Sequence, residues 1–198
     1  QSLGFDELQT IEIIRGIENG VDVSVYCKEE FNAAQMKALR LGLEEKLDVS
    51  RFADAQYDYM QMEELKQAVR SGMNMDDICN PKFSHSVMRE IRLASELNYD
   101  LTRYAKLGYS GEVLRQIRLA KKEDIDLTFF VEDNYDEYQL NEIRLGIHSC
   151  VDITKYLLHE YNGKQMEQIR LGLEEGIDVT PYNMVGFSSG QMKQIRLG

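Results

Sequence analysis

Arginine recurs in register along the chain, and its chemistry is the first candidate for function. The arginines lie 26 residues apart, or at multiples of that interval, at Arg40, Arg92, Arg118, Arg144, Arg170 and Arg196. A row of guanidinium groups could neutralise phosphates, and some helical-repeat proteins read RNA one base per repeat. The alternative is an internal role, in which each aliphatic stem packs while the guanidinium pairs with an acceptor.

An acidic column with the same interval favours the internal role. It contains Asp22, Asp48, Asp100, Asp126, Asp152 and Asp178. In one stretch of the chain both columns are interrupted, because Lys66 replaces the arginine and Asn74 replaces the aspartate. We therefore predict a structural staple that joins each arginine to an aspartate or to a backbone carbonyl group. Its members are Arg40, Arg92, Arg118, Arg144 and Arg170 with Asp48, Asp100, Asp126, Asp152 and Asp178.

The remaining reactive side chains do not form a recognisable catalytic or metal-binding set. The histidines His85, His148 and His159 occupy three different positions relative to the arginine column. The cysteines, Cys27, Cys79 and Cys150, are odd in number and include no C-x-x-C pair, so neither a disulfide framework nor a zinc site is indicated. We expect free thiols in a reducing, cytoplasmic setting, a protein that is not an enzyme, and no cofactor or metal.

Charge and hydropathy narrow the choice of partners. The 198 residues include 23 basic and 34 acidic side chains, for a formal net charge of -11. This excess of negative charge opposes phosphate binding, so a nucleic-acid partner is not expected. No run of 18 apolar residues is present, and we expect no membrane span.

The columns are parts of a tandem repeat without insertions. Its leading aromatic residues are Phe5, Phe31, Tyr57, Phe83, Tyr109, Tyr135, Tyr161 and Phe187, which begin copies 1 to 8. We predict one domain over 1–198, a single array whose last copy is truncated. The initial glutamine and the last copy, which stops inside an expected helix, suggest a piece excised from a longer array, with uncapped ends able to pair end to end.

Each copy should fold as a long helix, a tight turn and a short helix. The second residue of every copy is Asp, Asn or Ser, and six copies place Gln three residues later, which predicts a capping box. Apolar residues such as Met36, Leu39 and Leu43 follow at helical spacing. After about 13 residues of helix, glycine, asparagine or aspartate dominates a column that favours a left-handed helix end, which Lys46 and Cys150 fit less well.

A second column of Ser, Thr or Asp, from Ser24 to Thr180, should cap the short α or 3₁₀ helix, with Pro181 at its first position. Glycines in the middle of the long helices, such as Gly146, should allow close approach of the neighbouring copy's helix. The fold class expected is all-α, an α-solenoid of 26-residue repeats with about 7.5 repeats.

The block Gln165–Val179, which reads QMEQIRLGLEEGIDV, resembles the short tandem repeats of bacterial proteins of unassigned function. In architecture the unit is similar to leucine-rich-repeat variants, which alternate a longer α-helix with a short helix. The resemblance implies a superhelical array and brings no activity or site residue with it.

Residues that vary between copies are the candidates for binding, because packing fixes the others. The variable segments meet at the start of the long helix and at the end of the short one, and we expect them to form one continuous edge. Its apolar members would be interface anchors: Tyr59, Met60, Leu107, Tyr138 and Leu158. Neutral drift on a solvated edge is the alternative explanation.

The function predicted is therefore a non-enzymatic scaffold that binds a protein or peptide. The second hypothesis is a nucleic-acid-related role, through direct contact by the arginine column or as an acidic DNA mimic.

Overall fold

The computed structural model describes residues 4–198, which form ten α-helices and three 3₁₀ helices without a strand. The all-α prediction is confirmed. The chain divides into two compact units, Gln1–Gly111 and Glu112–Gly198, and each is described by itself. The boundary falls inside copy 5 and leaves the 26-residue interval unbroken. The single array of about 7.5 repeats stays a prediction.

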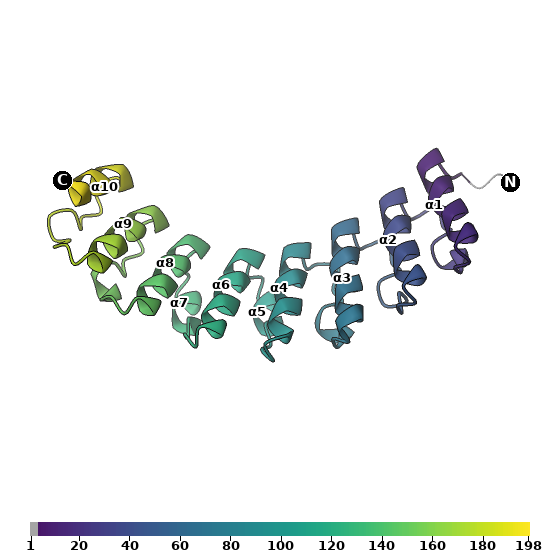
Figure 1. Ribbon diagram of the computed structural model, residues 1–198, viewed down its shortest axis with the longest axis horizontal. Helices are drawn as coiled ribbons and strands as arrows, with labels where there is room; N and C mark the ends of the chain where they lie inside the picture. The colour runs from purple at the N-terminus through teal and green to yellow at the C-terminus, as the bar shows by residue number, and fades with distance from the viewer. Residues whose placement is uncertain (1–3) are drawn as a thin grey trace. The chain divides into compact units, whose positions relative to one another are not determined.

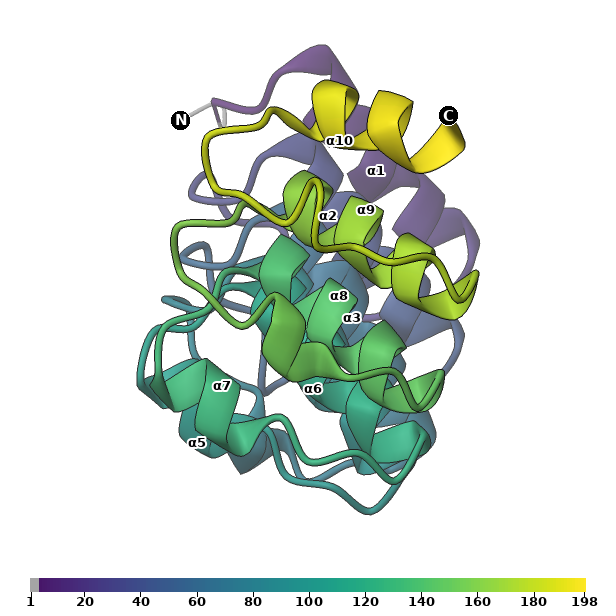
Figure 2. The same ribbon diagram turned by 90° about the vertical axis from the view of Figure 1, so that its left-hand side faces the viewer.

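Within each unit, successive long helices lie side by side (Figure 1). The helices of unit 1 are α1 (Glu7–Glu18), η1 (Val23–Val25), α2 (Ala33–Glu44), α3 (Tyr59–Ser71), η2 (Met75–Asp77), α4 (His85–Ser95) and α5 (Thr102–Lys106). Helix α6 (Gly111–Lys122) begins at the last residue of unit 1 and otherwise belongs to unit 2. Unit 2 continues with α7 (Thr128–Glu132), α8 (Glu137–His148), η3 (Ile153–Lys155), α9 (Gly163–Glu174) and α10 (Ser189–Leu197). Figure 2 shows α8, α9 and α10 in succession, with their connecting segments at both helix ends.

The long helices begin where local capping predicts. The six expected capping boxes are all formed, at α1, α2, α3, α8, α9 and α10. In the first of them the Gln9 N–H donates to Asp6 at 2.8 Å, and the Asp6 N–H donates to the Gln9 side chain at 2.8 Å. Each box satisfies two backbone N–H groups at the free end of a helix.

The turn after each long helix uses a left-handed residue in copies 1 to 7. Glycine takes this conformation in copies 1, 3 and 7, and the other four copies use Lys46 (φ 61°), Asn98 (φ 53°), Asp124 (φ 58°) and Cys150 (φ 56°). The prediction of a left-handed column is confirmed even at Lys46 and Cys150. The local hydrogen bonds of the helix end therefore outweigh the strain of a side chain at positive φ.

The second segment of the copy has three forms. It is 3₁₀ in copies 1, 3 and 6, a five-residue α-helix in copies 4 and 5, and a hydrogen-bonded turn in copies 2 and 7. The predicted capping column is displaced by two residues, because the capping side chains of η1, η2 and η3 are Asp22, Asn74 and Asp152. In copy 7, where the second segment is a turn, Pro181 does not begin a helix.

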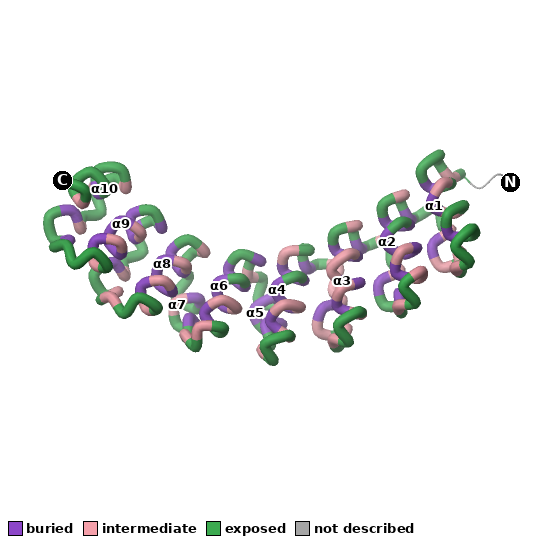
Figure 3. Tube along the Cα trace, in the orientation of Figure 1, coloured by how far each residue is buried: buried purple, intermediate pink, exposed green. Residues whose placement is uncertain are grey.

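Buried positions recur in every copy on the helix faces that meet a neighbour, and the turns are exposed (Figure 3). Met36, Met62, Met88, Met166 and Met192 are fully buried, as expected for core residues. None of the helices in the described part of the chain is long and apolar enough to cross a bilayer.

The helix glycines make room for a different partner from the one predicted. A Cβ on Gly146 would lie 1.9 Å from the hydroxyl oxygen of Tyr156, which belongs to the same copy. The equivalent distances are 1.8 Å for Gly16 with Tyr26 and 1.8 Å for Gly172 with Tyr182. At these three glycines the prediction of close packing holds, but the group that approaches is the copy's own tyrosine and not the neighbouring helix.

Candidate functional site

The predicted interface residues are exposed to different degrees. Leu107 and Tyr138 are each 69% exposed, Met60 is 49% and Leu158 is 47% exposed, whereas Tyr59 is half-buried. Tyr59, Met60 and Leu107 belong to unit 1, and Tyr138 and Leu158 belong to unit 2. The continuous edge proposed for all five is not tested by the structure of either unit.

Tyr138 lies in a groove of about 330 Å³ on the face of α6, α8 and α9 in unit 2. Three lining residues, Glu137, Tyr138 and Lys164, come from the first turns of α8 and α9. Further lining residues come from α6 and from the second turns of α8 and α9, and they include Glu112, Arg115, Asn141 and Glu167. Leu158 is not part of the groove.

The groove exists where the first turns of α8 and α9 approach each other closely. A Cβ added to Gly163 would lie 2.5 Å from the Cβ of Tyr138 and 2.9 Å from its carbonyl carbon. Only a residue without a side chain fits at this point. On the other side of the turn, Asp136 accepts hydrogen bonds from the N–H groups of Tyr138 (2.9 Å) and Gln139 (2.8 Å). The backbone of Tyr138 is thus fixed while its side chain remains exposed.

Below the groove lies a network of polar side chains that joins neighbouring copies. Arg170 in α9 donates through Nε to Glu142 in α8 at 2.8 Å and through Nη1 to Glu174 at 2.8 Å. Arg144 makes the equivalent Nε bond to Gln116 at 3.3 Å. Burial disfavours the charged form of Arg170, but the hydrogen bonds to Glu142 and Glu174 raise its pKa above the ordinary value. The arginine therefore remains charged.

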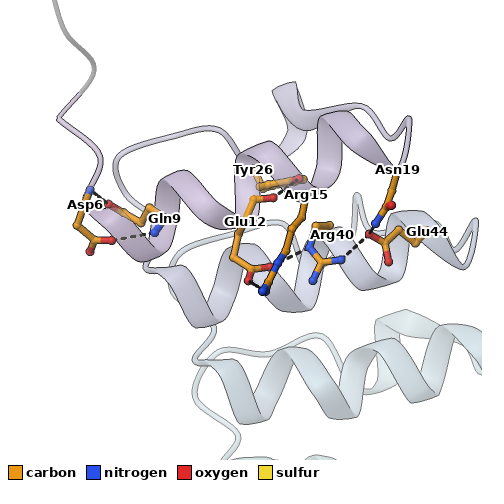
Figure 4. Close-up of polar contacts among 8 residues, drawn as sticks. All are labelled: Asp6, Gln9, Glu12, Arg15, Asn19, Tyr26, Arg40 and Glu44. Carbon is orange, nitrogen blue, oxygen red and sulfur yellow. Dashed lines mark hydrogen bonds and ion pairs between the residues drawn. The ribbon is translucent and has the colours of Figure 1, made fainter.

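The same arrangement links α1 to α2 in unit 1 (Figure 4). Arg40 donates through Nε to Glu12 of the preceding copy at 2.8 Å and through Nη1 to Glu44 of its own copy. The Asn19 side chain also donates to Glu44, at 2.7 Å. Arg92 in α4 forms the corresponding bonds with Glu64 and Glu96.

The predicted pairing between arginine and aspartate is wrong for Arg40, Arg92, Arg144 and Arg170, whose acceptors are glutamates and a glutamine. The aspartates instead accept hydrogen bonds from the N–H two residues later, at Asp48, Asp100, Asp126, Asp152 and Asp178. This contact places each carboxylate at the turn before the second segment of its copy, and in copy 6 it caps η3. Arg118 of the predicted set lies half-buried in α6.

The acceptors form a column of their own in the sequence. It lies 28 residues before the arginine, at Glu12, Glu64, Gln116, Glu142 and Gln168. Copy 3, which has lysine in place of the arginine, fits the pattern, since Lys66 follows Ala38 by the same interval and pairs within its own helix with Glu63. Residues separated by one period plus two do not meet within a helix or a turn. Whether they meet at all depends on how neighbouring helices pack side by side.

The other candidate reactive groups lie apart from the groove. No three His, Cys, Asp or Glu side chains among residues 4–198 are grouped to hold a metal ion. His159 stacks on Tyr135 with ring centroids 4.1 Å apart, and its Nε2 lies 3.1 Å from Asp133. The three cysteines are free thiols. What the groove offers chemically is an aromatic surface surrounded by charges.

In comparisons with protein-family models, curated proteins and solved structures, the chain matches none of them.

Proposed function

We propose that the protein is a non-enzymatic helical-repeat scaffold that binds a protein or peptide in the groove of unit 2. The observation that carries the proposal is Tyr138, an aromatic side chain that is 69% exposed within a hollow formed by three helices. An exposed aromatic residue held by a fixed backbone costs little entropy on binding, and tyrosine is enriched among the residues that dominate binding energy.

The fixed geometry around the groove supports a preformed site. The capping box of α8 and the contact with Gly163 hold the first turn, and the Glu142–Arg170 pair holds the base. A partner would therefore meet a surface whose backbone needs little rearrangement. Groups already in place favour binding because less conformational freedom is lost.

The arginine column is poorly suited to the alternative, direct contact with nucleic acid. Arg40 is 6% exposed, and Arg144 and Arg170 are each 8% exposed. Arg40 and Arg170 are paired with two carboxylates each, so a phosphate would have to displace them. Phosphate neutralisation needs cations that are available at the surface.

Site-specific photo-cross-linking tests this proposal. Tyr138 is replaced by the photoreactive residue p-benzoylphenylalanine, and the full chain is irradiated in an extract of the organism that makes it. Phe129 in α7 is the matched control, because it is 70% exposed in the same unit and lies outside the groove. We expect one predominant protein adduct from position 138 and none of comparable yield from position 129.

The result would count against the proposal if both positions gave the same adducts, or if neither gave any. An adduct that is removed by nuclease treatment and survives protease treatment would instead favour the nucleic-acid alternative. Both digestions are therefore part of the experiment.

A further inference from the structure

We infer that the groove of unit 2 takes a basic peptide segment, with an arginine or lysine side chain of the partner lying over the ring of Tyr138. This inference names the chemistry of the partner and rests on the function proposed above.

The charges lining the groove leave an excess of carboxylate. Two of its four glutamates are compensated within the protein, since Glu142 binds Arg170 at 2.8 Å and Glu112 lies 3.7 Å from Arg115. Glu137 and Glu167 form no ion pair within the described chain, and Lys164 is the one lining cation in the same condition. Two unpaired carboxylates against one unpaired ammonium group leave the site complementary to a positive charge.

The exposed ring adds a second attraction for a cation. The face of an aromatic ring carries negative potential, and it attracts a guanidinium or ammonium group that lies within about 6 Å of its centre. Glu137 precedes Tyr138 directly, so a carboxylate accompanies the ring. The Tyr138 hydroxyl has no hydrogen-bond partner among residues 4–198, and it is free to accept from the same group. Arginine fits best, because its planar guanidinium stacks on the ring and still donates to a carboxylate.

The charge of the chain acts in the same direction. A formal net charge of -11 attracts a basic segment from a distance and repels an acidic one. This long-range term also selects against nucleic acid as the occupant, because its phosphates would meet an acidic surface. A basic peptide is attracted both by the charges that line the groove and by the net charge of the chain.

The test measures binding of short fluorescent peptides to the full chain by anisotropy. The probe is a peptide of alternating arginine and serine, and the comparison peptides replace every arginine with glutamine or with glutamate. We expect the basic peptide alone to bind, with an affinity that falls between about 50 mM and about 200 mM salt because exposed charges are screened.

Four variants show where the peptide binds. Tyr138→Ala and Glu137→Gln should each weaken binding by at least about fivefold, which corresponds to roughly 1 kcal/mol. Phe129→Ala and Glu160→Gln are the matched controls, because they remove an equally exposed aromatic ring and an exposed carboxylate of unit 2 outside the groove. The controls should change the affinity by less than about twofold. Thermal unfolding of each variant verifies that the fold is retained.

The outcomes separate this inference from the proposed function. If the glutamine or glutamate peptide bound as well as the arginine peptide, and Tyr138→Ala weakened that binding, the groove would still be a binding site and the basic partner would be excluded. If Glu160→Gln and Phe129→Ala weakened binding as much as the groove variants, attraction would be general and the inference would be overturned. Absence of binding by all three peptides would overturn it too, and the cross-linking result at position 138 would then decide the proposed function independently.

Discussion

Gly146 leaves the space in which the side chain of Tyr156 forms a hydrogen bond. The tyrosine hydroxyl donates to the carbonyl of Glu142 at 3.1 Å, inside the preceding helix of the same copy. It reaches that carbonyl through the space that a Cβ on Gly146 would fill. Burial raises the pKa of Tyr156 above its ordinary value, so the hydroxyl stays protonated and continues to donate at neutral pH. The two residue types do not always occur together, since copy 4 combines Ala94 with Tyr104.

We predict that Gly146→Ala destabilises the protein by about 1–3 kcal/mol, because the added methyl group displaces the Tyr156 hydroxyl and strains the packing. Alanine would otherwise favour a helix interior by about 0.5–1 kcal/mol. Urea denaturation measures the change in the free energy of unfolding.

The second variant in this test is Tyr156→Phe, which removes the obstructing oxygen. Alone it should cost about 1 kcal/mol through the lost hydrogen bond. Combined with Gly146→Ala, it should cost less than the sum of the two separate effects. Strict additivity would show that the hydroxyl does not obstruct the methyl group.

At the scale of elements, glutamine at the third helix position connects one copy to the next. The Gln165 side chain completes the capping box of α9 with Asn162 and donates to the carbonyl of Phe187 at 2.7 Å and of Val185 at 3.1 Å. Gln139 forms the equivalent bonds to Tyr161 at 2.7 Å and His159 at 3.3 Å. Copies 4 and 5 have Val87 and Val113 at this position, and these are the two copies whose second segment is a five-residue α-helix. The residue at the third position of the long helix thus correlates with whether the second segment of the copy is a five-residue α-helix.

We predict that Gln165→Met lowers the free energy of unfolding by about 2–4 kcal/mol, since it removes the side-chain half of the capping box and leaves two carbonyl groups without their donor. Gln191→Met is the matched control. Gln191 completes a capping box with Ser188, and within the described residues its side chain makes no bond to a following copy.

The control should cost only about 1 kcal/mol, the contribution of a cap alone. Hydrogen exchange gives an independent measurement, in which Gln165→Met should increase exchange around 182–188. Equal destabilisation by the two variants would show that the bonds between copies contribute nothing beyond the cap.

At the scale of the whole molecule, the aspartates of the second segments make stability depend on pH. Hydrogen bonds from the following Ser or Thr side chain, together with its N–H, lower the pKa of Asp22, Asp48, Asp100, Asp126, Asp152 and Asp178 from 3.8. A carboxylate with a lower pKa in the folded state stabilises the fold above its unfolded pKa, and this contribution disappears as the pH falls through the folded pKa. Several carboxylates distributed over both units share this behaviour.

We therefore predict that these aspartates leave the free energy of unfolding almost constant above about pH 5. Below about pH 4 their protonation should lower it steadily. Urea denaturation at pH values from about 5 down to about 2.5 measures this decrease as a lower midpoint concentration of urea. In Asp152→Asn the slope against pH should be shallower, because one linked group no longer titrates. Glu160→Gln is the control, and a slope reduced equally by both variants would contradict the role given to the capping carboxylates.

The local features of the fold were predictable because their causes lie within a few residues. Asp6 with Gln9, or Asn162 with Gln165, caps a helix through atoms three positions apart, so the helix starts could be placed from sequence. The left-handed turn at Cys150 follows from its place in the period, although its residue type argues against it. The second capping column was misplaced by two residues, because Asp152 and Thr154 both carry side chains able to cap.

The 26-residue interval, the all-α class and the ends of the long helices can be read from the amino-acid sequence, because capping and turn chemistry act along the chain. The packing of the helices shows which group faces each arginine, what fills the space at Gly146, and that Tyr138 is far more exposed than Tyr59. The residues that join neighbouring copies are far apart in the sequence, by 22 residues in the Gln139–Tyr161 bond and by 28 in the Arg170–Glu142 bond. Such contacts depend on how one helix lies against the next, and a repeating sequence is compatible with several neighbouring pairings until the packing selects one.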